Sequence, residues 1–258
     1  MSRTSSTPTD VTAIEPLTHD EAMRLQAHEL GRTLALLRSL DDAAWGAGTA
    51  CPAWNIRAMY QHVLGACEAG ASVRENVHQL RQARAHRRAH GGPLEAALSA
   101  VQVRDRAHLS PAQIVERLTA AAPKTVRGRT RTPALVRQQA RLAVDGPVHE
   151  TWKLGYLIDT IYLRDLWMHR ADAASALGRP LELTAGHDGR IVADVVAEWA
   201  RRHGQPFTLA LSGPAGQTYA RGPGHPQAEH LSLDAVDFCR TLAGRGHRAG
   251  LLTTIVPF

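Results

Sequence analysis

The chain has 258 residues, of which 44% are hydrophobic and 21% are charged, a balance typical of globular proteins with a sizeable core. No apolar run approaches the roughly 20 residues of a membrane span, and residues 1–15 lack the apolar core of a secretory signal. The net charge of +6 and the pI near 9.8 permit a nucleic-acid partner, but they also suit a protein that handles anionic small molecules. Three cysteines without a CxxC pair fit a reducing compartment, so we expect a cytoplasmic protein.

The N-terminal region predicts a tail followed by a helix. Residues 1–16 contain Ser, Thr and Pro without a periodic pattern, and we predict that they are disordered. Thr18 and Glu21 then form a capping-box pattern, which predicts the start of a helix that runs to about Leu40.

A second helix is predicted from Asn55, a good N-cap, to roughly His90. Within it, His62 shares a side with Met59 and with small residues such as Gly65. A histidine on an apolar face is more often a satisfied core residue than a ligand, so His62 alone decides nothing. The Arg-rich end of this helix suggests nucleic acid, but without interleaved aromatic residues it is more typical of a solvated helix end.

The middle of the chain predicts two further helices. A short one is expected around Leu94–Val103, after the break at Gly91-Gly92-Pro93. Ser110-Pro111 opens a longer one that runs to about Ala122, with the serine as N-cap and the proline at the first helical position. Residues 123–146 give no clear structural pattern.

The long stretch from Leu154 to Leu177 predicts a central helix, because apolar residues occupy nearly all of its faces. Asp165 and His169 are four residues apart on it, so they lie on the same side. An unpaired buried charge is costly, and this spacing allows both side chains to bind one divalent metal. The pair can equally form a structural hydrogen bond, and the spacing alone leaves both interpretations open.

After Gly178 the pattern changes to alternating short strands and helices. We predict helices over Asp188–His203 and from Ser232 to about Ala243, and strands over Phe207–Leu211 and Gln217–Arg221. Further extended segments are predicted at Leu181–Thr184, Glu229–Leu231 and Leu251–Val256. The predicted organisation is thus a tail (1–16), a helical bundle (17–178) and a small α+β domain (179–258).

Three features in this order resemble a known family. Cys51-Pro52-Ala53-Trp54 precedes the helix with His62, and Asp165-Leu-Trp-Met-His169-Arg-Ala-Asp172 lies on the later long helix. The α+β domain ends in the segment Asp234–Phe258. Over about residues 18–258, the chain resembles the mycothiol-dependent maleylpyruvate isomerase family, within the DinB-like metal-binding four-helix bundles.

The resemblance implies a four-helix bundle whose core holds a divalent metal, typically zinc, on His62, Asp165 and His169. Family members often carry Glu where this chain has Asp165, a shorter acid that puts metal affinity and identity in question. Asp172 matches an acidic family position and is expected to orient a ligand or to form a surface interaction. Trp54 matches a recurring position, which we interpret as packing at the start of the second helix.

The chemistry that the resemblance implies is thiol transfer. Three protein ligands leave one metal position open, where a thiolate of mycothiol can bind and attack a small-molecule electrophile. Arg221 and Arg245 are candidates to bind an acidic substrate. Hence the leading hypothesis is a metal-dependent mycothiol S-transferase or isomerase without membrane association. The alternatives are a non-catalytic metal- or ligand-binding protein, a hydrolase that uses metal-bound water, and a nucleic-acid-binding protein.

Overall fold

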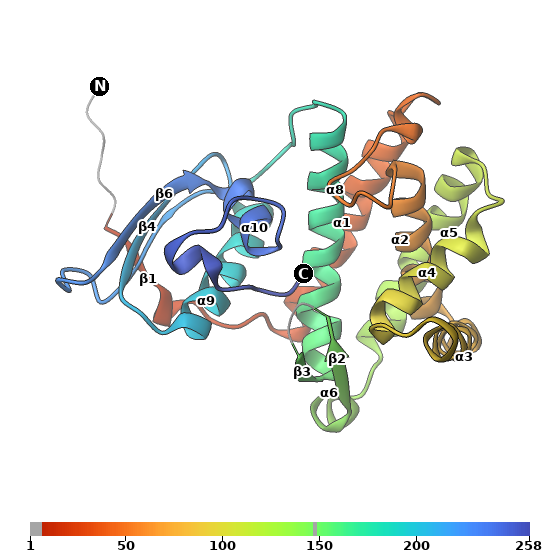
Figure 1. Ribbon diagram of the computed structural model, residues 1–258, viewed down its shortest axis with the longest axis horizontal. Coiled ribbons are helices and arrows are strands. Elements are labelled where there is room, and N and C mark those ends of the chain that lie inside the picture. The colour runs from red at the N-terminus through yellow and green to blue at the C-terminus, as the bar shows by residue number, and fades with distance from the viewer. Residues whose placement is uncertain (1–6, 147–148) are drawn as a thin grey trace. The chain divides into compact units, whose positions relative to one another are not determined.

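The computed structural model describes residues 7–146 and 149–258, which form two compact units (Figure 1). One unit comprises Thr18–Leu181 and is helical. The other combines the described residues up to Leu17 with Glu182–Phe258 and is an α+β unit. The predicted boundary at Gly178 lies three residues before Leu181, where the helical unit ends. In the described ranges, no helix is both long enough and apolar enough to cross a membrane.

The helical unit is built on four helices that share one hydrophobic core. They are α1 (His19–Arg38), α2 (Ile56–Ala71), α5 (Pro111–Thr130) and α8 (Tyr162–Ala176). All four contribute to the same buried cluster, in which Leu30, Met59, Leu118 and Leu166 represent one helix each. The sequence prediction of a bundle is thus confirmed.

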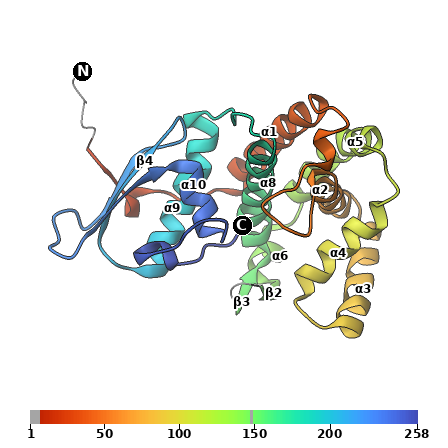
Figure 2. The same ribbon diagram turned by 45° about the horizontal axis from the view of Figure 1, so that its top comes forward.

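Two further helices extend the bundle on the side of α2. They are α3 (Val73–His90) and α4 (Leu94–Arg106), which pack on each other and, through α4, on α2 (Figures 1 and 2). The prediction of one continuous helix from Asn55 to His90 is wrong, because the chain turns at Ser72. Ser72 has extended backbone angles, and its hydroxyl accepts a hydrogen bond from Glu75 N at 3.3 Å, which caps α3.

The region after Ala122 forms more structure than the sequence indicated. Helix α5 continues through Pro123 to Thr130, because its inward face is buried as far as Thr125 and Arg129. A proline removes one helical hydrogen bond, and tertiary packing compensates for that loss here. The chain then forms α6 (Ala134–Gln139) and an antiparallel hairpin of β2 (Arg141–Asp145) and β3 (His149–Lys153). The hairpin leads directly into α7 (Leu154–Tyr156).

The α+β unit contains a four-stranded mixed sheet in the order β1-β5-β4-β6. The strands are β1 (Thr9–Asp10), β4 (Phe207–Ser212), β5 (Thr218–Arg221) and β6 (Glu229–Asp234). Helices α9 (Arg190–His203) and α10 (Ala235–Leu242) lie on one face of it (Figure 2). Trp199 of α9 contacts Phe207 and Phe238 with ring centroids 4.7 and 5.3 Å apart, which forms the core of this unit.

Three predictions for the α+β unit need correction. Residues 9–13 are ordered as β1 and a 3₁₀ turn, because β1 pairs in parallel with β5 through Thr9 and Asp10. The last helix is capped by Asp234 rather than Ser232, since the Asp234 carboxylate accepts from Val236 N at 2.8 Å. The segment predicted as a final strand contains a 3₁₀ turn, Gly250–Thr253, and no strand. The strands around 207–211 and 217–221 and the helix at 190–203 are confirmed.

Helices α2 and α5 approach each other closely at Gly70 and Gly128. A Cβ on Gly128 would overlap the backbone carbonyl of Gly70, whereas a Cβ on Gly31 in α1 would meet nothing within 4 Å. Gly128→Ala is expected to lower the free energy of unfolding by about 1–3 kcal/mol, because the helices must separate. Gly31→Ala is expected to raise it by up to about 1 kcal/mol through helix propensity. Urea unfolding of both variants measures the difference, and a stabilised Gly128→Ala would contradict the close approach.

Candidate metal centre

Helix α2 carries His62 on its inner side. Asn55 sets the start of this helix, because its side chain accepts a hydrogen bond from Ala58 N at 2.9 Å. Met59, Tyr60 and Val63 are buried around His62. The imidazole itself keeps 13% of its side-chain surface exposed, so it lies at the border of the core and not within it.

The long helical stretch that carries Asp165 and His169 is not a regular α-helix throughout. Between α7 and α8, Leu157–Ile161 form a π-helical turn. The carbonyl of Ile158 in this turn accepts a hydrogen bond from Gln26 Nε2 at 2.6 Å, and Gln26 Oε1 accepts from Arg129 Nη1 at 2.7 Å. The turn is therefore held by side chains of α1 and α5. Such turns insert one extra residue into a helix and often lie near functional sites.

The structure brings His62, Asp165 and His169 together. Their ligand atoms all lie within 4.8 Å of one another. His169 Nε2 is 3.2 Å from Asp165 Oδ1, and His62 Nε2 is 3.9 Å from Asp165 Oδ2. Ligands 2.0–2.1 Å from a tetrahedral ion lie roughly 3.3–3.5 Å apart, so this spacing is close to what a zinc ion requires.

The electrostatics of the trio favour an ionised carboxylate. Burial alone would raise the pKa of Asp165, but the adjacent His169 and His62 outweigh it and hold that pKa well below its usual range. At neutral pH the group is thus an anion between two imidazoles. A carboxylate and two neutral imidazoles are common zinc ligands.

The hydrogen bonding around the histidines also fits a metal. His62 Nδ1 and both ring nitrogens of His169 are buried and make no hydrogen bond to the residues that the structure describes, although His169 Nε2 lies 3.2 Å from Asp165 Oδ1. Buried polar nitrogens are normally satisfied, and an unsatisfied one has a free-energy cost. Coordination of a cation by His169 Nε2 would remove part of that cost.

Trp54 is a part of this site that sequence reasoning assigned only to packing. It does pack against the hydrophobic core. In addition, its ring centroid lies 5.1 Å from that of His62 with an interplanar angle of 31°, and 6.4 Å from that of His169. The position of Trp54 one residue before the cap Asn55 was visible in the sequence, but the direction of its ring was not.

The other predicted site residues have different surroundings. Asp172 is buried on α8. The pKa of the Tyr60 hydroxyl is raised, chiefly because Tyr60 is buried, and the negative charge of Asp172 adds to this effect. Since neither histidine Nδ1 has a partner in the described ranges, Asp172 does not hold these rings by a hydrogen bond. Arg221 and Arg245 belong to the α+β unit, where they donate to the carbonyls of Ala200 and Ala243 at 2.7 and 3.4 Å. Their binding of substrate stays a prediction.

The two buried cysteines are poorly suited to be nucleophiles. Burial raises the pKa of the Cys67 thiol to about 11, and Cys239 is also buried, whereas Cys51 is half-buried. We expect iodoacetamide at pH 8 to modify Cys51 in the native protein and to spare Cys67 and Cys239. Peptide mass spectrometry measures this, with urea-unfolded protein as the control in which all three react. Modification of native Cys67 at the rate of Cys51 would contradict the buried position.

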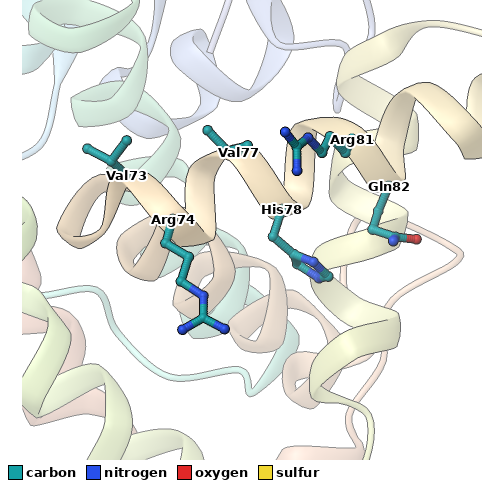
Figure 3. Close-up of a pocket in the computed structure, with 6 residues that line it drawn as sticks. All are labelled: Val73, Arg74, Val77, His78, Arg81 and Gln82. Carbon is teal, nitrogen blue, oxygen red and sulfur yellow. The ribbon is translucent and has the colours of Figure 1, made fainter.

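A surface hollow of about 470 Å³ lies along α3, a helix that carries no residue of the trio. Its lining comes from a single helix and is a mixture of apolar and basic side chains: Val73, Arg74, Val77, His78, Arg81 and Gln82 (Figure 3). Of these, only His78 is a usual metal ligand, so the hollow does not offer a second centre of the same kind.

Comparisons with known proteins give the family and the fold of the chain. The model of the mycothiol maleylpyruvate isomerase N-terminal domain matches residues 24–174, more than half of the chain and almost all of the helical unit. Two crystal structures share the fold. One is the mycothiol-dependent maleylpyruvate isomerase, with 17% sequence identity and a TM-score of 0.56. The other is its mutant with one histidine changed to alanine, with 16% sequence identity and a TM-score of 0.55. Both alignments cover 92% of each chain. A search of curated proteins found no match. The chain therefore belongs to the family of the mycothiol maleylpyruvate isomerase N-terminal domain.

Proposed function

We propose that the protein is a metal-dependent S-transferase or isomerase that uses mycothiol as co-substrate. The observation that carries this proposal is the convergence of two imidazoles and one carboxylate from α2 and α8. Membership of a family named for a mycothiol-dependent isomerase supports the choice of thiol.

The residues fit a cation that keeps one position open. His62, Asp165 and His169 supply three ligands, the number found at catalytic rather than structural zinc sites. The Asp165 side chain is 27% exposed, so a small molecule can reach this side of the trio. When bound, a zinc ion would stabilise a thiolate and so make a small thiol nucleophilic at neutral pH.

The protein residues have distinct tasks in this proposal. The two imidazoles and the carboxylate hold the cation, and the anionic Asp165 offsets one of its two positive charges. The nucleophile comes from the co-substrate, since Cys67 and Cys239 are buried and the half-buried Cys51 is not part of the trio. The acceptor is a small electrophile such as an activated alkene, which then leaves as an isomer or as a thiol conjugate.

Turnover assays with one component omitted test the proposal. Protein loaded with Zn²⁺ is incubated with mycothiol and maleylpyruvate or another activated alkene, and loss of the alkene is followed by absorbance. We expect turnover only when metal, mycothiol and alkene are all present, and its loss after treatment with a chelator. Turnover without mycothiol would favour a hydrolase that uses water instead. Metal binding without thiol consumption across a panel of electrophiles would favour a non-catalytic protein.

A further inference from the structure

Among the described residues, no protein group hydrogen-bonds to Nδ1 of either imidazole of the trio. A ligating histidine almost always donates its second ring N–H to a carboxylate, a carbonyl or water, which fixes the orientation of the ring. In this protein, Nδ1 of His62 and Nδ1 of His169 are buried without a partner in the described part of the chain. Among the described residues, no protein hydrogen bond to Nδ1 therefore fixes the orientation of either ring.

Aromatic contacts surround both rings. The Trp54 ring is tilted by 31° relative to the His62 ring, and the two ring centroids are 5.1 Å apart. His62 and His169 then meet edge to face, with centroids 5.3 Å apart and an angle of 78°. These distances and angles are in the range in which aromatic rings attract each other. Both Trp54 and His169 thus contact the His62 ring.

The backbone of Trp54 is itself fixed. Its carbonyl accepts hydrogen bonds from Thr49 N at 3.1 Å and Thr49 Oγ1 at 2.8 Å, and its N–H donates to Cys51 O at 2.9 Å. The next residue, Asn55, caps α2. A ring on so constrained a backbone can hold its neighbour in one orientation.

We propose that Trp54 is a positioning residue, which orients the His62 imidazole toward the metal by stacking in place of a hydrogen bond to Nδ1. This inference rests on the proposed metal site. A hydrogen bond to the second nitrogen also makes an imidazole a better electron donor. Without it, His62 and His169 would leave more positive charge on a bound ion, which would favour the thiolate form of a thiol there.

Metal affinity of Trp54 variants tests this role without an activity assay. Trp54→Phe keeps a flat ring and is expected to bind Co²⁺ within a few-fold of the wild type. Trp54→Leu and Trp54→Met remove the ring, and the affinity is expected to fall by about 10–100-fold, as for the loss of a supporting contact to a ligand. Trp152→Leu is the matched control, because Trp152 contacts Tyr156 and not the trio. Competition with a chelator measures all affinities, and circular dichroism checks that each variant is folded.

A spectroscopic signal separates positioning from general packing. Bound Co²⁺ quenches nearby tryptophan emission, so part of the quenching in the wild type should be absent in Trp54→Phe although the metal still binds. Equal affinity of wild type, Trp54→Leu and Trp54→Met would overturn the role of Trp54 and leave the proposed metal site intact. If the wild type binds no more Co²⁺ than His62→Ala does, the metal site itself is wrong.

Discussion

Replacing His169 by alanine is expected to abolish stoichiometric zinc binding. The variant loses one of three proposed ligands. Loss of a contact that only supports a ligand lowers metal affinity about 10–100-fold, so loss of a ligand itself should lower it further. His62→Ala should behave in the same way, because the two nitrogens approach opposite oxygens of Asp165 at 3.2 and 3.9 Å. Metal analysis of purified protein and competition with a chelator measure the loss.

His78→Ala is the matched control for this prediction. His78 also faces a carboxylate, Asp105, at 3.1 Å, but it is half exposed and has no second histidine beside that carboxylate among the described residues. The His78→Ala variant should therefore bind zinc as the wild type does. Equal zinc content in the wild type, His62→Ala and His169→Ala would remove the claim of a metal centre.

The second large effect is expected on stability, at Arg106 of α4. Only 3% of this side chain is exposed, and its guanidinium donates to Glu68 of α2, Glu75 of α3 and the carbonyl of Gln102. Removing one member of a buried ion pair costs about 3–5 kcal/mol, because the partner keeps its desolvated charge. Arg106→Ala should fall near the lower end of this range, since Glu68 retains its bond to Arg117.

Urea unfolding followed by circular dichroism measures this loss, and the neighbouring Arg104 gives the control. Arg104 is 54% exposed and pairs with Asp105 at 2.8 Å on the surface. Such a pair contributes about 0–1 kcal/mol, so Arg104→Ala should change the free energy of unfolding little. An equal loss of unfolding free energy in both variants would show that the buried network of Arg106 does not stabilise the packing of α2, α3 and α4.

Two separate signals in the sequence point to the candidate ligands His62, Asp165 and His169. The spacing of Asp165 and His169 places them on one side of a helix by geometry alone. The third member, His62, is more than a hundred residues away, and only the resemblance connected it to them. The π-helical turn at Leu157–Ile161 was not predictable. Nearly every face of this helical stretch is apolar, so the insertion of one residue into the helix does not visibly change its hydrophobic pattern.

Errors in the fold came from apolar residues that are not buried and from pairings between distant segments. In the sequence, Val73 and Val77 continue the apolar pattern of the predicted second helix. In the structure the chain turns at Ser72, and 82% of Val73 is exposed. Strand β1 has two residues and forms only through β5, about 200 residues away. Local patterns carry no information about such a partner.

The α+β unit is assembled from both ends of the polypeptide, and this has a practical consequence for fragments. β1 covers the edge of β5, and Arg190 donates to the carbonyl of Glu15 at 2.9 Å. A fragment cut out at Glu182 would leave that edge bare, and bare edges recruit strands from other molecules. Anyone who wishes to study this half in isolation should therefore rejoin residues 7–17 to it by circular permutation rather than by simple truncation.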